Sequence, residues 1–167
     1  MNRATRGLCT GLALGISIEL SISTAAGDAG DAGEVRQPGN RDRCPVCGMF
    51  VAPFPEWIAQ IVYEDDTVDF FDGCKDLFRL LEAPEKYSQP RNRRAVRTVL
   101  VTSYYDQLLI TAQEAIFVAG SDVLGPMGAE LIPLRSLEEA EEFTRDHQGT
   151  GIFRFGEVTP EVVSSLK

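Results

Sequence analysis

The chain has 167 residues, of which 44% are hydrophobic and 25% are charged, and its formal net charge is −9. This composition excludes a disordered chain and supplies enough apolar material for the core of one compact domain. The acidic balance, without a basic stripe between aromatic residues, excludes nucleic acid as the partner.

The first 26 residues have the pattern of a secretory signal peptide. Arg3 and Arg6 give a positive start, residues 8–18 are largely apolar, and small residues around Ala25 and Ala26 suit a cleavage site. The apolar run is too short for a permanent anchor and no later run is longer, so the mature chain is expected to lack an integral membrane segment. The pattern predicts a periplasmic or otherwise exported protein.

Removal of residues 1–26 also removes Cys9 and leaves Cys44, Cys47 and Cys74. Three is an odd number in a compartment where disulfides form, so at least one thiol stays free, pairs between chains or binds a metal. No cysteine lies near the predicted cleavage site, which argues against a lipid anchor.

The folded part is predicted to begin at Cys44, because residues 27–43 are polar, rich in glycine and without an apolar period, as in a flexible tether. Two strands follow as a hairpin, at 57–63 and 67–71. Residues 72–83 then have helical spacing, with Asp72 as the expected N-cap and Cys74 on the apolar face. We therefore expect Cys74 to pack in the core.

The second half of the domain repeats this order in a weaker form. A helix is expected after Ser136, whose pairing with Glu139 is typical of a capping box. A strand and a helix therefore recur here as they do at 57–83, which suggests internal duplication within an α+β fold. The other segments expected here are strands at 95–105, 108–120 (with a turn), 129–134 and 151–155, a glycine-rich loop at 120–128 and a short terminal helix at 159–166.

The motif "CPVCGM" at 44–49 admits several interpretations. A thioredoxin-like redox pair needs its first cysteine at the start of a helix within a parallel sheet, and Gly48 and the prolines that follow oppose a helix here. Structural zinc needs four ligands, usually two pairs of Cys or His, and no second pair exists. His147, at a helix end, is expected to interact with the helix dipole instead. A stapling disulfide between Cys44 and Cys47 stays open.

The remaining interpretation is a soft-metal site. Cu(I) prefers thiolate and thioether donors, and Cys47 and Met49 flank one glycine that lets both sulfurs approach one point. Met127, in "GPMG", is the other methionine besides the initiator, and it too lies between glycines in an expected loop. The candidate ligands are therefore Cys47, Met49 and Met127, with Cys44 as a further candidate.

The segments "CPVCGM", "AQIVYEDDTVDFFDG", "EAIFVAGSDVLGPMGAELIP" and "FRFGEV" resemble, in this order, the NosL family of periplasmic copper chaperones for nitrous-oxide reductase. The resemblance covers roughly residues 44–157. It implies two related ββα-containing halves, about 44–90 and 95–157, packed together with mostly antiparallel strands.

The resemblance also implies a function. It implies Cu(I) bound by the first motif, with Met127 as an added ligand or a transfer residue, and delivery through a membrane ABC-transporter maturation complex. The chain departs from the family at Ala129, where many relatives have histidine. The main hypothesis is thus a metallochaperone that is not an enzyme and serves nitrous-oxide reductase or a related copper enzyme. The alternatives are an exported thiol–disulfide oxidoreductase that acts on a copper protein, and a general metal-handling or sensor module.

Overall fold

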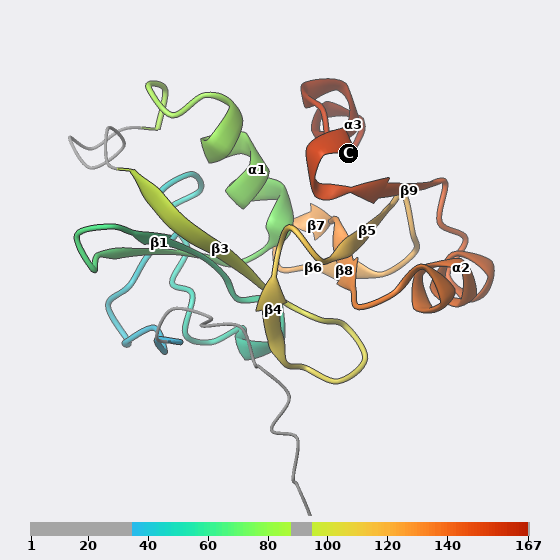
Figure 1. Ribbon diagram of the computed structural model, residues 1–167, viewed down its shortest axis with the longest axis horizontal. Coiled ribbons are helices and arrows are strands. Elements are labelled where there is room, and N and C mark those ends of the chain that lie inside the picture. Colours follow the sequence, from blue (N-terminus) through green and yellow to red (C-terminus); the bar gives the residue numbers. More distant parts are fainter. Residues whose placement is uncertain (1–34, 88–94, 167) are drawn as a thin grey trace, which may run out of the picture.

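A computed structural model describes residues 35–87 and 95–166 (Figure 1). The signal peptide predicted over 1–26 and the first part of the predicted tether therefore lie outside the described residues. Among the described residues, no helix combines the length and the apolar character that crossing a membrane requires.

The first half of the domain is built on an antiparallel sheet of four strands in the order β2-β1-β3-β4. This sheet extends to residue 111, so the first half continues past the boundary expected between residues 90 and 95. The central strand β1 is buried throughout because both of its faces are covered. Helix α1 packs against β1 on one side, and the side chain of Gln60 donates a hydrogen bond of 2.8 Å to the carbonyl of Arg36 in the preceding segment. The strands are β1 (Ala59–Tyr63), β2 (Val68–Phe71), β3 (Val96–Thr102) and β4 (Leu109–Thr111).

The second half carries a smaller antiparallel sheet in the order β8-β5-β9, with helix α2 packed on it. As predicted, Ser136 is the N-cap of α2, and its hydroxyl accepts a 3.1 Å hydrogen bond from the amide of Glu139. The carboxylate of Glu139 reaches the amide of Arg135 instead of the N-cap amide. The elements are β5 (Ile116–Ala119), β8 (Ile132–Leu134), α2 (Leu137–Asp146) and β9 (Gly151–Arg154).

The two sheets share one connection pattern, which confirms the predicted duplication. In each half the first strand is central, the next sheet strand pairs with one edge of it, a helix follows, and a third strand pairs with the other edge. The strands β2, β1 and β3 around α1 thus correspond to β8, β5 and β9 around α2. The predicted class, α+β with related halves and antiparallel strands, is confirmed.

Short elements complete the fold. Helix α3 lies beside α1 (Figure 1). The segment predicted as a glycine-rich loop contains a small hairpin, in which Gly125 of β6 pairs with Gly128 of β7. These elements are η1 (Pro55–Trp57), α1 (Cys74–Glu82), β6 (Leu124–Gly125), β7 (Gly128–Ala129), η3 (Phe155–Glu157) and α3 (Pro160–Ser165).

The main core joins the two halves. The ring of Phe78 on α1 meets the ring of Phe117 on β5 edge to face, with their centroids 5.1 Å apart. Cys74 lies in this core, 3% exposed, as its helical spacing predicted. A smaller core lies between the second sheet and α2, where Phe143 is fully buried. The start of α1 therefore sits at the junction of the halves on a rigid support.

The prediction that Asp72 caps α1 is wrong. The helix begins at Cys74 after the N-cap Gly73, which makes no side-chain capping bond. The Asp72 side chain accepts a hydrogen bond from Cys47 instead. The helix receives its capping group from the other half of the domain, where Glu130 accepts a hydrogen bond from the amide of Lys75.

Candidate metal centre

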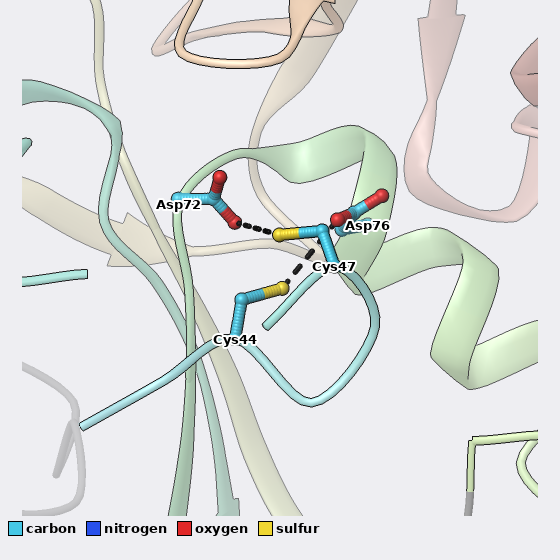
Figure 2. Close-up of side chains that lie close together, drawn as sticks. All are labelled: Cys44, Cys47, Asp72 and Asp76. Carbon is cyan, nitrogen blue, oxygen red and sulfur yellow. Dashed lines mark hydrogen bonds between the residues drawn. The ribbon is translucent and has the colours of Figure 1, made fainter. Parts of the chain in front are cut away.

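The CxxC motif forms a tight loop rather than the start of a helix. The amide of Cys44 donates to the carbonyl of Met49, and the amide of Gly48 donates to the carbonyl of Cys44, both at 2.9 Å. Gly48 has a φ of 78°, a backbone conformation that favours glycine. The loop therefore reverses within a few residues and presents both cysteine side chains to the start of α1 (Figure 2).

Arg43 stabilises this loop from its flank. Its guanidinium lies over the ring of Phe50, 3.6 Å from the centroid, and also donates a 2.7 Å hydrogen bond to the carbonyl of Gly48. Arg43 and Phe50 are in addition paired through their backbones. A cation over an aromatic face is worth about 0.5–1 kcal/mol at an exposed site. These contacts close the loop from both sides.

Four side chains meet where the loop faces α1. The thiol of Cys47 donates to Asp72 at 3.2 Å, and the thiol of Cys44 donates to Asp76 at 3.4 Å. One ligand atom from each of these four residues lies within 4.8 Å of the others. Figure 2 shows the two sulfurs facing the two carboxylates, which come from the end of β2 and the first turn of α1. This arrangement is a protected cluster of two thiols and two carboxylates.

The carboxylates of this cluster are unusual in their burial. Asp72 and Asp76 are 2% and 3% exposed. Asp76 is partly neutralised by Arg79, at 2.8 Å. The Oδ2 atom of Asp72, by contrast, is buried without any hydrogen-bond partner among the described residues. Because buried polar atoms are nearly always satisfied, this free oxygen beside two thiols fits a cation site.

Both thiols of the cluster are held in the protonated form. Burial raises the pKa of Cys44 far above its usual range, and burial together with Asp72 and Asp76 raises the pKa of Cys47 to about 11. A nucleophilic or redox-active cysteine requires the opposite shift. A metal that binds as the thiolate complex must displace these protons, and its affinity therefore rises with pH.

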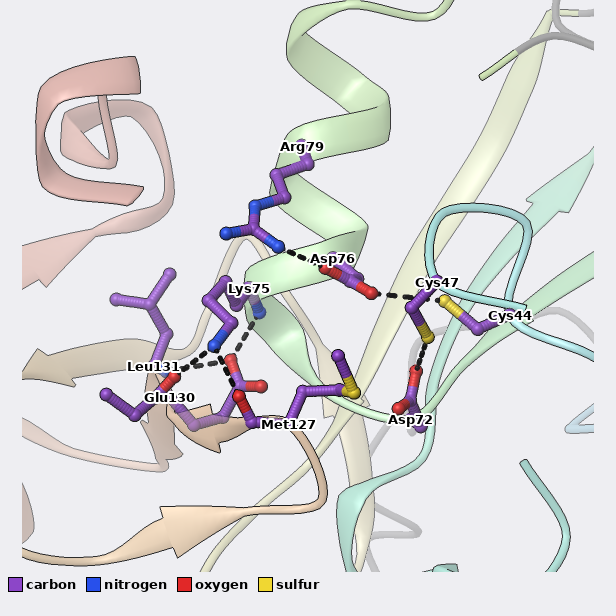
Figure 3. Close-up of polar contacts among 10 residues, drawn as sticks. Cys44, Cys47, Asp72, Lys75, Asp76, Arg79, Met127, Glu130 and Leu131 are labelled. Carbon is purple, nitrogen blue, oxygen red and sulfur yellow. Dashed lines mark hydrogen bonds and ion pairs between the residues drawn. The ribbon is translucent and has the colours of Figure 1, made fainter. Parts of the chain in front are cut away.

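Met127 is placed near this cluster by the β6–β7 hairpin. Its side chain is 43% exposed at the hairpin tip. Its carbonyl accepts a 3.0 Å hydrogen bond from the ammonium of Lys75, which lies on α1 next to Asp76. Figure 3 shows the Met127 side chain extending from the hairpin toward Asp72 and Cys47. A second thioether candidate, Met49, is half-buried, and its carbonyl closes the CxxC loop.

Glu130 is the other buried carboxylate near α1. Burial raises its pKa to about 7, although the amides of Leu131 and Lys75 and the charge of Lys75 oppose the shift, and the charge of Asp76 adds to it. The group therefore keeps its proton in the folded chain to a higher pH than in the unfolded chain.

We expect Glu130→Gln to change how stability depends on pH. The carboxyl titrates near 4.5 when unfolded and near 7 when folded, so the folded chain binds more protons in this window. The free energy of unfolding of the wild type then falls as pH rises, by on the order of 3 kcal/mol. Gln does not titrate and should remove this slope. Urea unfolding at both ends of the window measures it, and parallel wild-type and variant profiles would contradict the assignment.

The structure thus brings together Cys44 and Cys47 and places the Met127 hairpin on the same end of α1. Metal ligation by Cys44, Cys47, Met49 and Met127 stays a prediction. Asp72 and Asp76 were not among the ligands predicted from the sequence. Their only local signal was two aspartates four residues apart in "FDGCKD", one just before α1 and one in its first turn.

His147 lies elsewhere in the fold, as its sequence position suggested. It is the C-cap of α2, and its Nδ1 atom lies 3.1 Å from Asp122. Within the described part of the chain, the group of candidate metal ligands is the Cys44, Cys47, Asp72 and Asp76 cluster, which does not include His147.

Comparison with known proteins agrees with this architecture. The crystal structure of the copper chaperone NosL from Shewanella denitrificans superposes with a TM-score of 0.64 at 26% identity, over 77% of this chain and 97% of that chain. The solution structure of apo-NosL from Achromobacter cycloclastes is also 26% identical, covering 63% and 87% of the two chains, with a TM-score of 0.45. A search of curated proteins gave no match. The NosL family model matches residues 35–163, and the chain therefore belongs to the NosL family.

Proposed function

We propose that this protein is an exported Cu(I)-binding metallochaperone without turnover of its own. The observation that carries the proposal is the cluster in which Cys44 and Cys47 meet beside the unpartnered Oδ2 of Asp72. The NosL protein from Shewanella denitrificans, of which the match covers 97%, is a copper chaperone. Two soft sulfur donors in a preformed cluster suit Cu(I), which prefers thiolate and thioether ligands.

The exposure of the sulfur donors supports a carrier. Cys44 is 1% exposed, Cys47 is half-buried, and Met127 at the hairpin tip is 43% exposed. A series of donors from the interior to the surface allows an ion to be held inside and handed on at the surface. A thioether binds more weakly than a thiolate, and Met127 is therefore suited to be the exit ligand when an acceptor docks.

The oxidoreductase alternative has less support from the same site. The CxxC loop precedes an antiparallel sheet and does not begin a helix. The pKa of Cys47 is raised rather than lowered, which disfavours the thiolate that disulfide exchange requires. We propose nitrous-oxide reductase, or a related copper enzyme, as the acceptor, reached in the periplasm through a membrane ABC-transporter maturation complex.

Met127→Leu tests this route of transfer. Leucine keeps the size and apolarity of the side chain and removes the sulfur, so packing and ligation are separated. We expect normal folding, a loss of Cu(I) affinity of about tenfold, and a large loss of acceptor maturation at limiting copper. The measurement is the copper content and activity of the acceptor enzyme in cells that carry the variant. Full maturation under these conditions would remove Met127 from the transfer route.

A further inference from the structure

The structure assigns a positioning role to Lys75: we infer that this residue holds the Met127 hairpin in place beside the Cys44 and Cys47 pair. The inference rests on the proposed function, in which Met127 completes the copper site. It starts from a polar junction between the two halves of the domain, which Figure 3 shows between α1 and the β6–β7 hairpin.

Lys75 is buried, although it is a lysine on the first turn of a helix. The residue is 4% exposed. Its ammonium donates to the carbonyl of Met127 at 3.0 Å and to the carbonyl of Ala129 at 2.5 Å. Lysine is almost never fully buried unless its charge has partners, so these two carbonyls are the reason that it can remain there. A single side chain of the first half therefore holds the turn of the hairpin and its second strand, β7.

Glu130 fixes the same helical turn from the opposite direction. Its carboxylate accepts hydrogen bonds from the amides of Lys75 and Leu131. The contact needs Gly73, because a Cβ atom there would lie 2.1 Å from the Glu130 Oε2 atom. The hairpin and the segment after it thus hold α1 through the backbone of Lys75, while the side chain of Lys75 holds the hairpin. The start of α1 and the hairpin segment, 55 residues apart in the sequence, thus stabilise each other's position.

The hairpin needs this support. Each of its strands, β6 and β7, has two residues, and an isolated two-stranded hairpin is marginally stable in water. Without the Lys75 ammonium, the tip would be held mainly by this short pairing. The turn of α1 that carries Lys75 also carries Asp76, which accepts the hydrogen bond of Cys44. Lys75 therefore sets the distance between the Met127 thioether and the cysteine sulfurs.

A double-mutant cycle tests the inference. The mature chain is prepared as wild type, Lys75→Leu, Met127→Leu and the double variant, and Cu(I) affinity is measured without oxygen against a chromophoric Cu(I) chelator. Lys75→Leu removes the donors of the side chain and adds no sulfur that could bind copper. We expect each single variant to lose about tenfold in affinity, because Met127→Leu removes a weak thioether donor and Lys75→Leu removes the outer-shell support of that donor. The double variant should lose about tenfold as well, rather than the hundredfold of independent effects.

A spectroscopic readout separates positioning from general stability. X-ray absorption of the copper-loaded protein should show one sulfur neighbour fewer in Lys75→Leu, as in Met127→Leu. Arg135→Leu is the matched control, because Arg135 pairs with Asp106 and also joins the second half to a loop of the first. It should leave affinity and sulfur count unchanged. If Lys75→Leu does not fold, Lys75→Gln makes the same test, since its polar end is one bond too short to reach both carbonyls.

The outcomes discriminate between the two proposals. Additive losses in the cycle, wild-type affinity in Lys75→Leu, or an unchanged sulfur count would overturn the positioning role while copper binding stands. A wild-type chain that binds no Cu(I), or whose binding does not depend on Cys47, would refute the proposed function and with it this inference.

Discussion

Replacing Cys47 with serine is expected to lower Cu(I) affinity by more than about 100-fold, the upper end of what changes outside the ligand shell cost. The hydroxyl is a hard donor that stays protonated, so it cannot replace a thiolate for a soft ion. Cys47 is also the more accessible thiol of the cluster, which makes it the first to meet an incoming ion. Competition with a chromophoric Cu(I) chelator measures the loss.

Cys74→Ala is the control for this experiment. Cys74 is buried in the core at the start of α1, so we expect it to contribute packing rather than a copper ligand. The variant should keep wild-type copper affinity and lose about 1 kcal/mol of stability, as is usual for a small core truncation. Similar copper losses in Cys47→Ser and Cys74→Ala would mean that general destabilisation, not ligation, explains both.

Oxidation is expected to have an equally large effect on copper loading. The ligand atoms of Cys44 and Cys47 belong to a group that lies within 4.8 Å, so a small movement of the loop brings the sulfurs to bonding distance. A disulfide removes both thiolate donors at once. We expect the oxidised chain to take up almost no Cu(I) and to recover fully after treatment with a thiol reductant.

The measurement is copper bound per chain, after removal of free metal, before and after reduction. Met127→Leu should show the same dependence on reductant, because its thioether does not take part in the disulfide. An oxidised protein that loads as much copper as the reduced protein would exclude both cysteines as ligands.

The sequence alone predicted the elements of the fold well, because local patterns determine most of them. Alternating β-branched residues marked β1, and Ser136 with Glu139 marked the start of α2. The error at Asp72 has a physical reason. A side chain suited to cap a helix has another partner in the folded chain, and Glu130 from the second half caps α1 in its place. The local sequence around Asp72 cannot indicate that a residue distant in the sequence takes over the capping role.

The candidate site shows the same limit. Cys44 and Cys47 were identifiable by spacing, whereas Asp72 and Asp76 join them only through the packing of the CxxC loop on α1. The sequence has no second pair of cysteine or histidine ligands for zinc. Two buried carboxylates are also acceptable zinc ligands, so the preference for copper depends on the thioethers and must be measured against zinc.

The most direct test of the central claim is metal selectivity of the reduced mature chain. The protein is titrated with Cu(I) in the absence of oxygen and in the presence of equimolar Zn²⁺. A competing chelator then removes weakly bound metal, and the metal that stays on the protein is quantified. We expect one copper per chain, little zinc, and a rise in melting temperature with bound copper. Stoichiometric zinc in place of copper, or a melting temperature that copper does not change, would contradict it.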